Sequence, residues 1–540
     1  MEKRDDSPEV SDQPNPEAKS APPPLDLEAQ RANVDVPLPQ TDSHANEKKS
    51  VYPKWVDDPE NPLNWPTSKK WRVCLIVSVT GLLSTLSSSM VAPAGHQIAV
   101  SVGSGNVGKR VETLLTVIYV LGLGFGPFIF SPIAELFGRQ VSYILSTVPY
   151  ALLTASCIVA PNLYSLIILR FFCGICGSSG PTLGVATVSD VFSPAQRGKP
   201  ISIYALGPMA GPVMGSMFGG WLSLVGYRWI FGTLTIMTTL NCVAIVLFME
   251  ETYATTVKFK LEHRRKTLQA KSAVGSSSSS TVCEEDLNRK IAFKEKHAWI
   301  ASLVSQANYR LVFLRAFTRP FRFLFTNPVL AIFALYYSYI YGVIYLLIIA
   351  LPILFSASDA LPGLFSYGWS SATFPLAFLS LGLGFFSAAF LAATMQASTF
   401  HRYGDNGQPE YRLVLTQIGM IFFPIGWFIF AWTAHSGAYF ICPMIGLALG
   451  GFGLMLAFNS IQNFVVDLTS PYSAAGTAAI SFSRSIVACV LPVFGPDLFQ
   501  ALGWNWGGSL LAFLSMLVMF APLIMFLYGK QLRERFQLRG

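Results

Sequence analysis

Four charged residues lie inside, or at the edges of, apolar runs long enough to cross a membrane. Arg170 lies within such a run, whereas Glu135, Arg139 and Asp190 lie where runs end. A charge in an apolar segment is costly and is usually functional. A fixed cation such as Arg170 lowers the pKa of nearby acids and can organise a proton path, so proton coupling is its predicted role. The alternative is a side chain that reaches outward to the lipid headgroups.

Glu135, Arg139 and Asp190 are predicted to meet at one end of the helices. Glu135 and Arg139 flank the turn after one run, and Asp190 ends the run of Arg170 on the same side. Opposite charges placed in this way predict an ion-pair latch, a cytoplasmic gate that stabilises one of two states of a cavity. The alternative is the ordinary charge decoration of cytoplasmic helix ends.

Small residues recur every four positions in a later run. Gly207, Gly211, Gly215 and Gly219 share one helix face, with Pro208 and Pro212 beside two of them. Small residues let a neighbouring backbone approach closely, and proline weakens straight helical geometry. The pattern predicts a helix that slides or bends, whereas simple close packing is the alternative.

A tyrosine-rich run follows the middle of the chain. Tyr337, Tyr341 and Tyr345 are four residues apart and therefore share a face. Facing a cavity, they would offer aromatic surface and hydroxyl groups to a lipophilic ligand. Facing lipid near the membrane surface, they would anchor the helix instead.

The composition indicates that membrane helices position these residues. Hydrophobic residues make up 52% of the chain and charged residues 13%, and the mean hydropathy is +0.46. A span needs about 20 apolar residues. Twelve such runs begin near Val73, Leu114, Val141, Leu163, Ile201, Trp229, Val329, Trp369, Leu413, Tyr439, Ala475 and Gly507. The predicted fold class is an all-α membrane protein with twelve transmembrane helices in two six-helix bundles.

One long polar stretch divides these runs into two sets of six. It contains the serine run Ser276–Ser280 and many basic residues, with a predicted amphipathic helix near Ala316–Phe325. The expected organisation is a disordered cytoplasmic tail (1–70), an N-terminal bundle (71–250), a cytoplasmic linker (251–326), a C-terminal bundle (327–530) and a cytoplasmic tail (531–540). Basic residues gather in the connections on the side of both termini, which predicts that both termini are cytoplasmic.

The two halves echo each other. Asp-Val-Phe-Ser-Pro from Asp190 corresponds to Asp-Leu-Thr-Ser-Pro from Asp467, and Pro-Met-Ala-Gly-Pro from Pro208 corresponds to Pro-Val-Phe-Gly-Pro from Pro492. Matching signatures in matching runs suggest parallel repeats, a feature of transporters. The eight Cys lack metal spacing, and no nucleophile or paired-acid motif suggests an enzyme.

Several segments resemble the major facilitator superfamily. Gly126–Arg139 resembles its loop motif, Arg170 with its flanking Phe and Gly resembles its fourth-span motif, and Gly207–Gly220 with Tyr227–Trp229 resembles its antiporter motif. Similarity to the fungal drug–proton antiporter branch rests on Asn61–Pro66, Glu251–Tyr253, Arg319–Phe321, Pro409–Arg412 and the pair Gln462 and Asn463. Gln140 departs from the loop motif, which often has a second basic residue there, and the first span (73–93) has no acid.

This resemblance implies two bundles around a cavity that opens alternately to either side, and proton-coupled efflux of a lipophilic drug or secondary metabolite. Gln462 and Asn463 are expected to line the cavity with the three tyrosines. The other expectations are a monomer in the plasma membrane, no cofactor beyond the proton gradient, and no nucleic-acid partner. Alternatives are a carrier of polyamines or other solutes with this fold, and a solute sensor that does not transport.

Overall fold

The computed structural model describes residues 55–102, 108–193, 196, 198–262, 265, 309–403, 409–469 and 473–535. Within these residues every element is helical, apart from one isolated β-bridge between Ser356 and Trp369. The first helices are α1 (Thr67–Ser89), α2 (Gly95–Val102), α3 (Lys109–Leu136), α4 (Arg139–Ile158), α5 (Leu163–Gly177), α6 (Ser179–Val191), α7 (Gly198–Ser223) and α8 (Tyr227–Phe248). The later ones are α11 (Tyr309–Thr326), α12 (Pro328–Phe355), α13 (Phe378–Tyr403), α14 (Val414–His435), α15 (Ile441–Leu468), α16 (Ser473–Val518) and α17 (Phe520–Arg535).

The helices have the length and composition of membrane spans. Ten stretches within the described residues are long and apolar enough to cross a membrane. One of them, Ala475–Gly529, is broken at Gly503, whose φ of 73° lies outside the helical region. The helix α7, with two internal prolines, is outside the ten. The expected all-α membrane fold is confirmed, and the number twelve stays a prediction.

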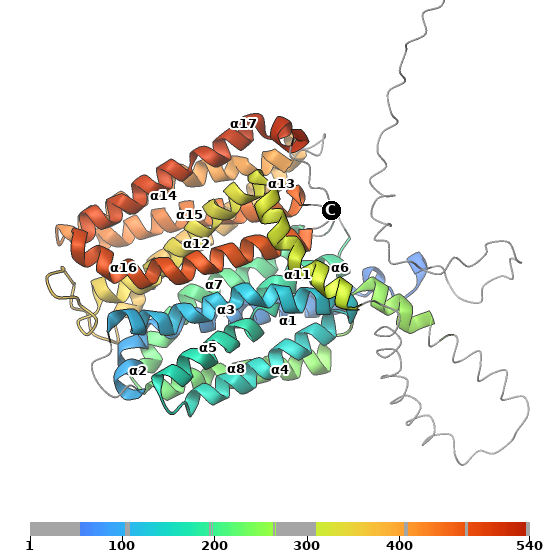
Figure 1. Cartoon of the computed structure of the whole chain (residues 1–540), viewed down its shortest axis with the longest axis horizontal. Coiled ribbons are helices and arrows are strands. Elements are labelled where there is room, and N and C mark those ends of the chain that lie inside the picture. Colours follow the sequence, from blue (N-terminus) through green and yellow to red (C-terminus); the bar gives the residue numbers. More distant parts are fainter. Residues whose placement is uncertain are drawn as a thin grey trace, which may run out of the picture. The chain divides into compact units, whose positions relative to one another are not determined.

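The helices form two halves. In the N-terminal half (α1 to α8), α1 packs on α7, α3 on α5 and α4 on α8. In the C-terminal half (α11 to α17), α14 and α13 pack on α15, and α12 packs on α16. The blue-to-green and yellow-to-red helices of Figure 1 correspond to these halves. The halves meet mainly where α3 lies against α16 and α7 against α13.

The two ends of the helical bundle are called the Lys109 end and the Arg139 end. The Lys109 end is where α3 begins and α4 ends, and the Arg139 end is where α3 ends and α4 begins. The helices α3 and α16 run antiparallel, because Arg110 contacts Asp497 whereas Phe128 contacts Phe482. The start of α12 belongs to the Arg139 end, where Asn327 accepts a hydrogen bond from the N–H of Leu330 (3.0 Å) and caps the helix.

The structure adds detail near two of the predicted boundaries, which themselves stay predictions. Residues 55–64, expected in a disordered tail, contain the 3₁₀ turns Trp55–Asp57 and Pro62–Asn64, and Asp58 pairs with Arg265 at 2.6 Å. The last helix α17 continues to Arg535, beyond the expected limit of 530. The predicted amphipathic helix is confirmed as part of α11, whereas the serine run lies outside the described residues.

Candidate functional site

An aromatic cluster lies between α12 and α15. Tyr337 stacks on Phe458 with ring centroids 4.5 Å apart, and Tyr341 stacks on the same ring at 5.8 Å. Tyr345 meets Tyr341 edge to face at 5.1 Å. Tyr337 and Tyr345 have no exposed surface, and Tyr341 is 8% exposed. These tyrosines therefore do not face lipid, which removes the alternative of an anchor at the membrane surface.

Polar partners fix the positions of the tyrosine hydroxyls. The hydroxyl of Tyr337 donates to Gln462 Oε1 on α15 (2.8 Å). The hydroxyls of Tyr345 and Ser88 lie 2.7 Å apart, which joins α12 to α1 across the two halves. Three tyrosines and Gln462 are thus close together, and their expected place in a substrate cavity stays a prediction. Asn463 is partly buried on α15, and its part in a cavity stays a prediction.

A second cation within the helices, Arg484 on α16, is partly exposed and completes this cluster. Its Nη1 donates to the hydroxyl of Tyr337 (3.3 Å), and its guanidinium carbon lies 4.6 Å from the ring centre of Tyr341. The guanidinium also lies 5.9 Å from the ring of Phe458. Among the described residues no carboxylate pairs with Arg484. A charge is thus held by aromatic rings and one phenol, a contact that delocalised guanidinium groups make well.

Arg170 on α5 is enclosed by the N-terminal half. Its Nη2 donates to the backbone carbonyl of Ser87 (2.9 Å), and its Nη1 donates to the Ser87 hydroxyl (3.2 Å). The guanidinium lies over the rings of Tyr119 (4.6 Å) and Phe231 (6.0 Å), and 1% of the residue is exposed. The side chain therefore points into the bundle and not outward to headgroups. A role in proton coupling stays a prediction.

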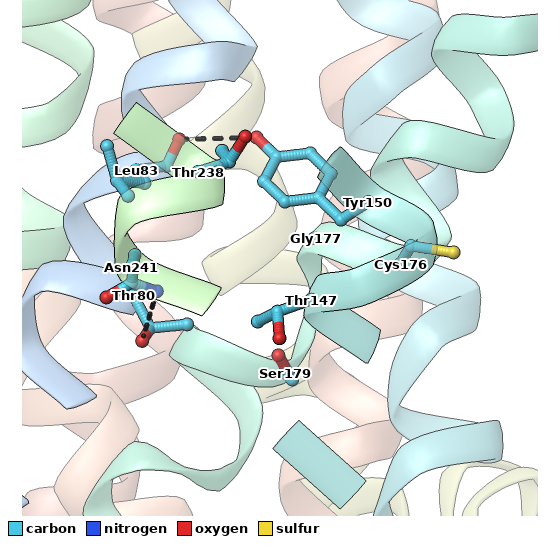
Figure 2. A pocket seen from close by; sticks show the side chains of 9 residues that line it. All are labelled: Thr80, Leu83, Thr147, Tyr150, Cys176, Gly177, Ser179, Thr238 and Asn241. Atoms are coloured by element: carbon cyan, nitrogen blue, oxygen red, sulfur yellow. Dashed lines mark hydrogen bonds between the residues drawn. The ribbon is translucent and has the colours of Figure 1, made fainter. Parts of the chain in front are cut away.

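Hydroxyl groups connect the surroundings of Arg170 to a small polar cavity. Tyr119 donates to the hydroxyl of Tyr150 (3.3 Å), and Tyr150 donates to the carbonyl of Leu83 (3.5 Å). Figure 2 shows Tyr150 at one side of a cavity of about 10 Å³, room for roughly one water molecule. The lining residues come from α1, α4, α5, α6 and α8: Thr80, Leu83, Thr147, Tyr150, Cys176, Gly177, Ser179, Thr238 and Asn241.

The predicted latch at the Arg139 end is formed by two of its three residues. Arg139 Nε lies 3.0 Å from Asp190 Oδ2, which ties the start of α4 to the end of α6. Glu135 is exposed at the end of α3 and makes no ion pair or hydrogen bond within the described part of the chain. The charged groups that interact electrostatically with the Glu135 carboxylate are Arg139 and Arg319. A role of all three as a gate stays a prediction.

Glu251 takes the place in this cluster that was expected for Glu135. Its carboxylate accepts hydrogen bonds from the backbone N–H groups of Arg139 (2.8 Å) and Gln140 (3.2 Å). A carboxylate is stabilised there because a helix N-terminus carries partial positive charge. Gly138 precedes the helix with φ of 96°, and a side chain there would overlap the Glu251 carboxylate. The side-chain amide of Gln140 donates to the carbonyl of Met249 (2.6 Å). Gln140, which replaces the second basic residue of the motif, is therefore held by a hydrogen bond.

The C-terminal half repeats the ion pair. Arg412, just before α14, pairs with Asp467 near the end of α15. Arg139 and Asp190 occupy the same places relative to α4 and α6. The sequence echo between Asp190 and Asp467 thus corresponds to one contact made twice.

The glycine face of α7 packs on α1. A side chain at Gly207 would overlap Ser78, and one at Gly211 would overlap Thr85. In the same way, a side chain at Gly215 would overlap Ser89, and one at Gly219 would overlap Met90. The shared face is therefore used for close backbone approach, with Pro208 packed against Gly81. Sliding or bending of this helix, which the pattern with Pro208 and Pro212 predicts, stays a prediction.

At the Lys109 end, ion pairs join the halves. Lys109 Nζ lies 3.3 Å from Asp359 Oδ1 in the connection after α12, and 3.0 Å from Glu112. Arg110 Nε lies 2.8 Å from Asp497 Oδ2 on α16. The indole N–H of Trp221 donates to the carbonyl of Ala372 (3.1 Å). The two halves are thus in direct contact at this end.

Comparison with known families decides what kind of molecule this is. The sequence model of the Major Facilitator Superfamily matches residues 77–492. The chain belongs to the major facilitator superfamily. Members of this superfamily are multi-pass membrane transporters, which bind small-molecule substrates within the membrane. The family and fold are therefore those of transporters and not of enzymes, and no group of metal-ligating side chains is found among the described residues.

Fungal transporters are similar along most of the chain. The efflux pump radE of Floropilus chiversii is 31% identical over 491 residues, which cover 89% of this chain and 85% of that protein. The transporter penM of Penicillium rubens is 33% identical, with 88% of each chain covered. Among solved structures, the proton:xylose symporter XylE from E. coli has a TM-score of 0.58 at 14% identity, covering 88% of this chain and 100% of that one. That likeness shows the fold.

Sequence reasoning missed Arg484 and the part played by Glu251. Arg484 stands in an apolar run, so the rule that singled out Arg170 would also have found it. The bonds of Glu251 join residues 112 positions apart, and no local pattern predicts such a contact. The ion pairs at the Lys109 end were missed because they join residues 250 and 387 positions apart in the sequence.

Proposed function

We propose that this chain exports lipophilic small molecules, drugs or a secondary metabolite, across the fungal plasma membrane by alternating access, driven by the proton gradient. One observation supports this most: aromatic side chains and Arg484 form a cluster next to the Ser88–Tyr345 contact, where the two halves meet. Aromatic rings suit lipophilic ligands. Relatives that share most of the chain include a protein named as an efflux pump.

The proposed orientation places the Arg139 end in the cytoplasm. Basic residues there include Lys69, Lys70, Arg72, Arg139 and Arg412, whereas the Lys109 end holds Lys109, Arg110 and Arg228. Basic residues are enriched in short cytoplasmic loops. Both termini then face the cytoplasm, and the contacts at the Lys109 end close the outer side. We expect a monomer that needs no cofactor.

Polyamine transport fits the centre of the molecule less well. The charged groups within the described spans near the centre are Arg170 and Arg484. Cations bound by a carrier would need carboxylates there, and like charges repel. We therefore favour export of neutral or acidic lipophilic solutes.

Proton coupling is assigned to Arg170 and its hydroxyl neighbours. The guanidinium is always charged, and it lies beside Tyr119, which is hydrogen-bonded to Tyr150. That hydroxyl pair leads to the cavity of Figure 2, which has room for about one water molecule. A water held there would link Arg170 to polar groups of α1, α4 and α8.

The test is efflux from fungal cells that lack their own drug exporters and express the full chain. A panel of neutral and of acidic lipophilic fluorescent compounds is loaded, and export is followed with and without an uncoupler at matched surface expression. We expect the uncoupler to abolish concentrative export. The variant Arg170→Ala should reach the membrane but fail to concentrate export, and Arg170→Lys should be intermediate because charge remains without the planar fork. Arg322→Ala, at an exposed arginine of α11, is the matched control.

Two results would contradict the proposal. Export of no compound in the panel would remove the efflux function. Wild-type export by Arg170→Ala that still collapses with the uncoupler would remove Arg170 from coupling and leave efflux intact.

A further inference from the structure

Within the part of the chain that the structure describes, the guanidinium of Arg484 has no anionic partner. Among the described residues it makes one hydrogen bond, from Nη1 to the Tyr337 hydroxyl. Its Nε is buried and has no hydrogen-bond partner there. The ionisable groups around it include the phenols of Tyr337, Tyr341 and Tyr345, which are neutral at neutral pH. Charged groups removed from water are costly unless they are paired. The site therefore holds a charge that it does not neutralise.

The Nε of Arg170 also lacks a partner among the described residues, and Arg484 differs from Arg170 in its exposure and in the number of its hydrogen bonds. Two donors of Arg170 are used by Ser87, and the residue is 1% exposed. Arg484 is partly exposed, as are its neighbours Phe458 and Gln462. A solute that enters between the halves can therefore reach Arg484, whereas Arg170 is shielded.

One hydrogen bond, to the Tyr337 hydroxyl, holds the guanidinium of Arg484 in place within the described part of the chain. Tyr337 accepts from Arg484 and donates to Gln462 (2.8 Å), so this phenol is fully used and fixes the orientation of the guanidinium. Tyr341 and Phe458 lie under the guanidinium as nearly parallel rings, with an interplanar angle of 19°. The result is a stack of aromatic rings beside an incompletely paired planar cation.

From this geometry we propose that the site at Arg484 binds an acidic aromatic solute, whose carboxylate or phenolate pairs with the guanidinium while its ring packs against the stacked rings of Tyr341 and Phe458. Planar oxyanions match the donor fork of arginine in two-point contacts. Aromatic stacking adds affinity without selecting a single ring system. This assignment of substrate class rests on the proposed export function.

Two probes that differ in charge and share a shape test the assignment. Binding of 2-naphthoate and of 2-naphthamide to the purified full chain in lipid nanodiscs is measured by equilibrium dialysis at neutral pH. We expect the wild type to bind the naphthoate at least about tenfold more tightly, the scale of one charge-assisted hydrogen bond. The variant Arg484→Gln should bind both probes alike, with affinity for the amide unchanged. The control Arg322→Gln should keep the wild-type preference.

Arg484→Lys covers the case in which Arg484→Gln fails to fold. It keeps the charge and loses the planar fork, so a reduced preference for the naphthoate is expected. Equal binding of the two probes by the wild type, or the full preference in either Arg484 variant, overturns the assignment. Such a result, together with export of the neutral compounds of the panel, leaves the export function standing. Export of no panel member is the failure of that function instead.

Discussion

At the Lys109 end the ion pairs run between the two halves, whereas at the Arg139 end each ion pair lies within one half. Lys109 reaches Asp359 and Arg110 reaches Asp497, in both cases from α3 to the C-terminal half. Arg139–Asp190 and Arg412–Asp467 join helices of the same half. Contacts of the first kind must break before the halves separate. Contacts of the second kind can persist while the halves move as bodies.

This difference assigns separate tasks to charges that look alike in the sequence. Pairs within a half keep its helices together, and their loss should reduce stability. Pairs between halves set the balance of two states, and their loss should shift a population. Burial then decides the size of each effect, because exposed pairs contribute little.

The largest effect is expected for Arg139→Ala. The side chains of Arg139 and Asp190 are 10% and 21% exposed, and removal of one partner from a largely buried pair costs about 3 kcal/mol. Thermal unfolding of the purified protein should occur at a clearly lower temperature, with Arg139→Lys in between. An unchanged unfolding temperature would show that this pair does not stabilise the N-terminal half.

Asp359→Asn should change the balance of states more than the stability. Lys109 would lose its partner in the other half, a loss of about 1.5 kcal/mol or roughly a tenfold change in the ratio of the two states. The distance between spin labels at Val159 and Tyr439, which are exposed at this end on opposite halves, should lengthen. An unaltered distance distribution would mean that Lys109–Asp359 does not hold this end closed.

Arg412→Gln should resemble Arg139→Ala on a smaller scale. The Arg412 and Asp467 side chains are 26% and 33% exposed, so a loss of about 1 kcal/mol is expected. The same unfolding experiment measures it. A loss larger than that of Arg139→Ala would contradict the link between burial and effect.

Arg110→Gln should have the smallest effect. Its side chain and that of Asp497 are 64% and 45% exposed, and such pairs change a population ratio by less than about threefold. The shift in the Val159–Tyr439 distance should disappear at high salt, because exposed charges are screened. If Arg110→Gln shifted the distance as much as Asp359→Asn and the shift persisted at high salt, the expected order of the two ion pairs at the Lys109 end would be wrong.

Much of the fold could be predicted from the sequence, because apolar runs and their charged borders are local features. The spacing of the α7 glycines and of the α12 tyrosines correctly predicted shared faces, since helical periodicity fixes them. The direction in which a face points depends on neighbouring helices. The choice between lipid and interior for Tyr337 therefore needed the structure.

The contacts of the candidate site were less accessible from the sequence. The partner of Arg170 is the backbone and hydroxyl of Ser87, and residue types alone do not indicate a carbonyl as a partner. Glu135 and Glu251 have the same charge, and only the position of the chain after α8 selects Glu251 for the N-terminus of α4. Arg484 could be predicted from the sequence, because it is a charged residue within an apolar run.

The most direct test of alternating access follows both ends in one experiment. Label pairs at Val159 and Tyr439, and at Gln196 and Gln531, report on the Lys109 end and the Arg139 end, in a background with the eight native Cys replaced. Distances are measured by pulsed electron paramagnetic resonance in nanodiscs, at neutral and at acidic pH. The account predicts that the Val159–Tyr439 distance lengthens in the sample in which the Gln196–Gln531 distance shortens. Lengthening of both distances together, or no change at either end, would contradict it.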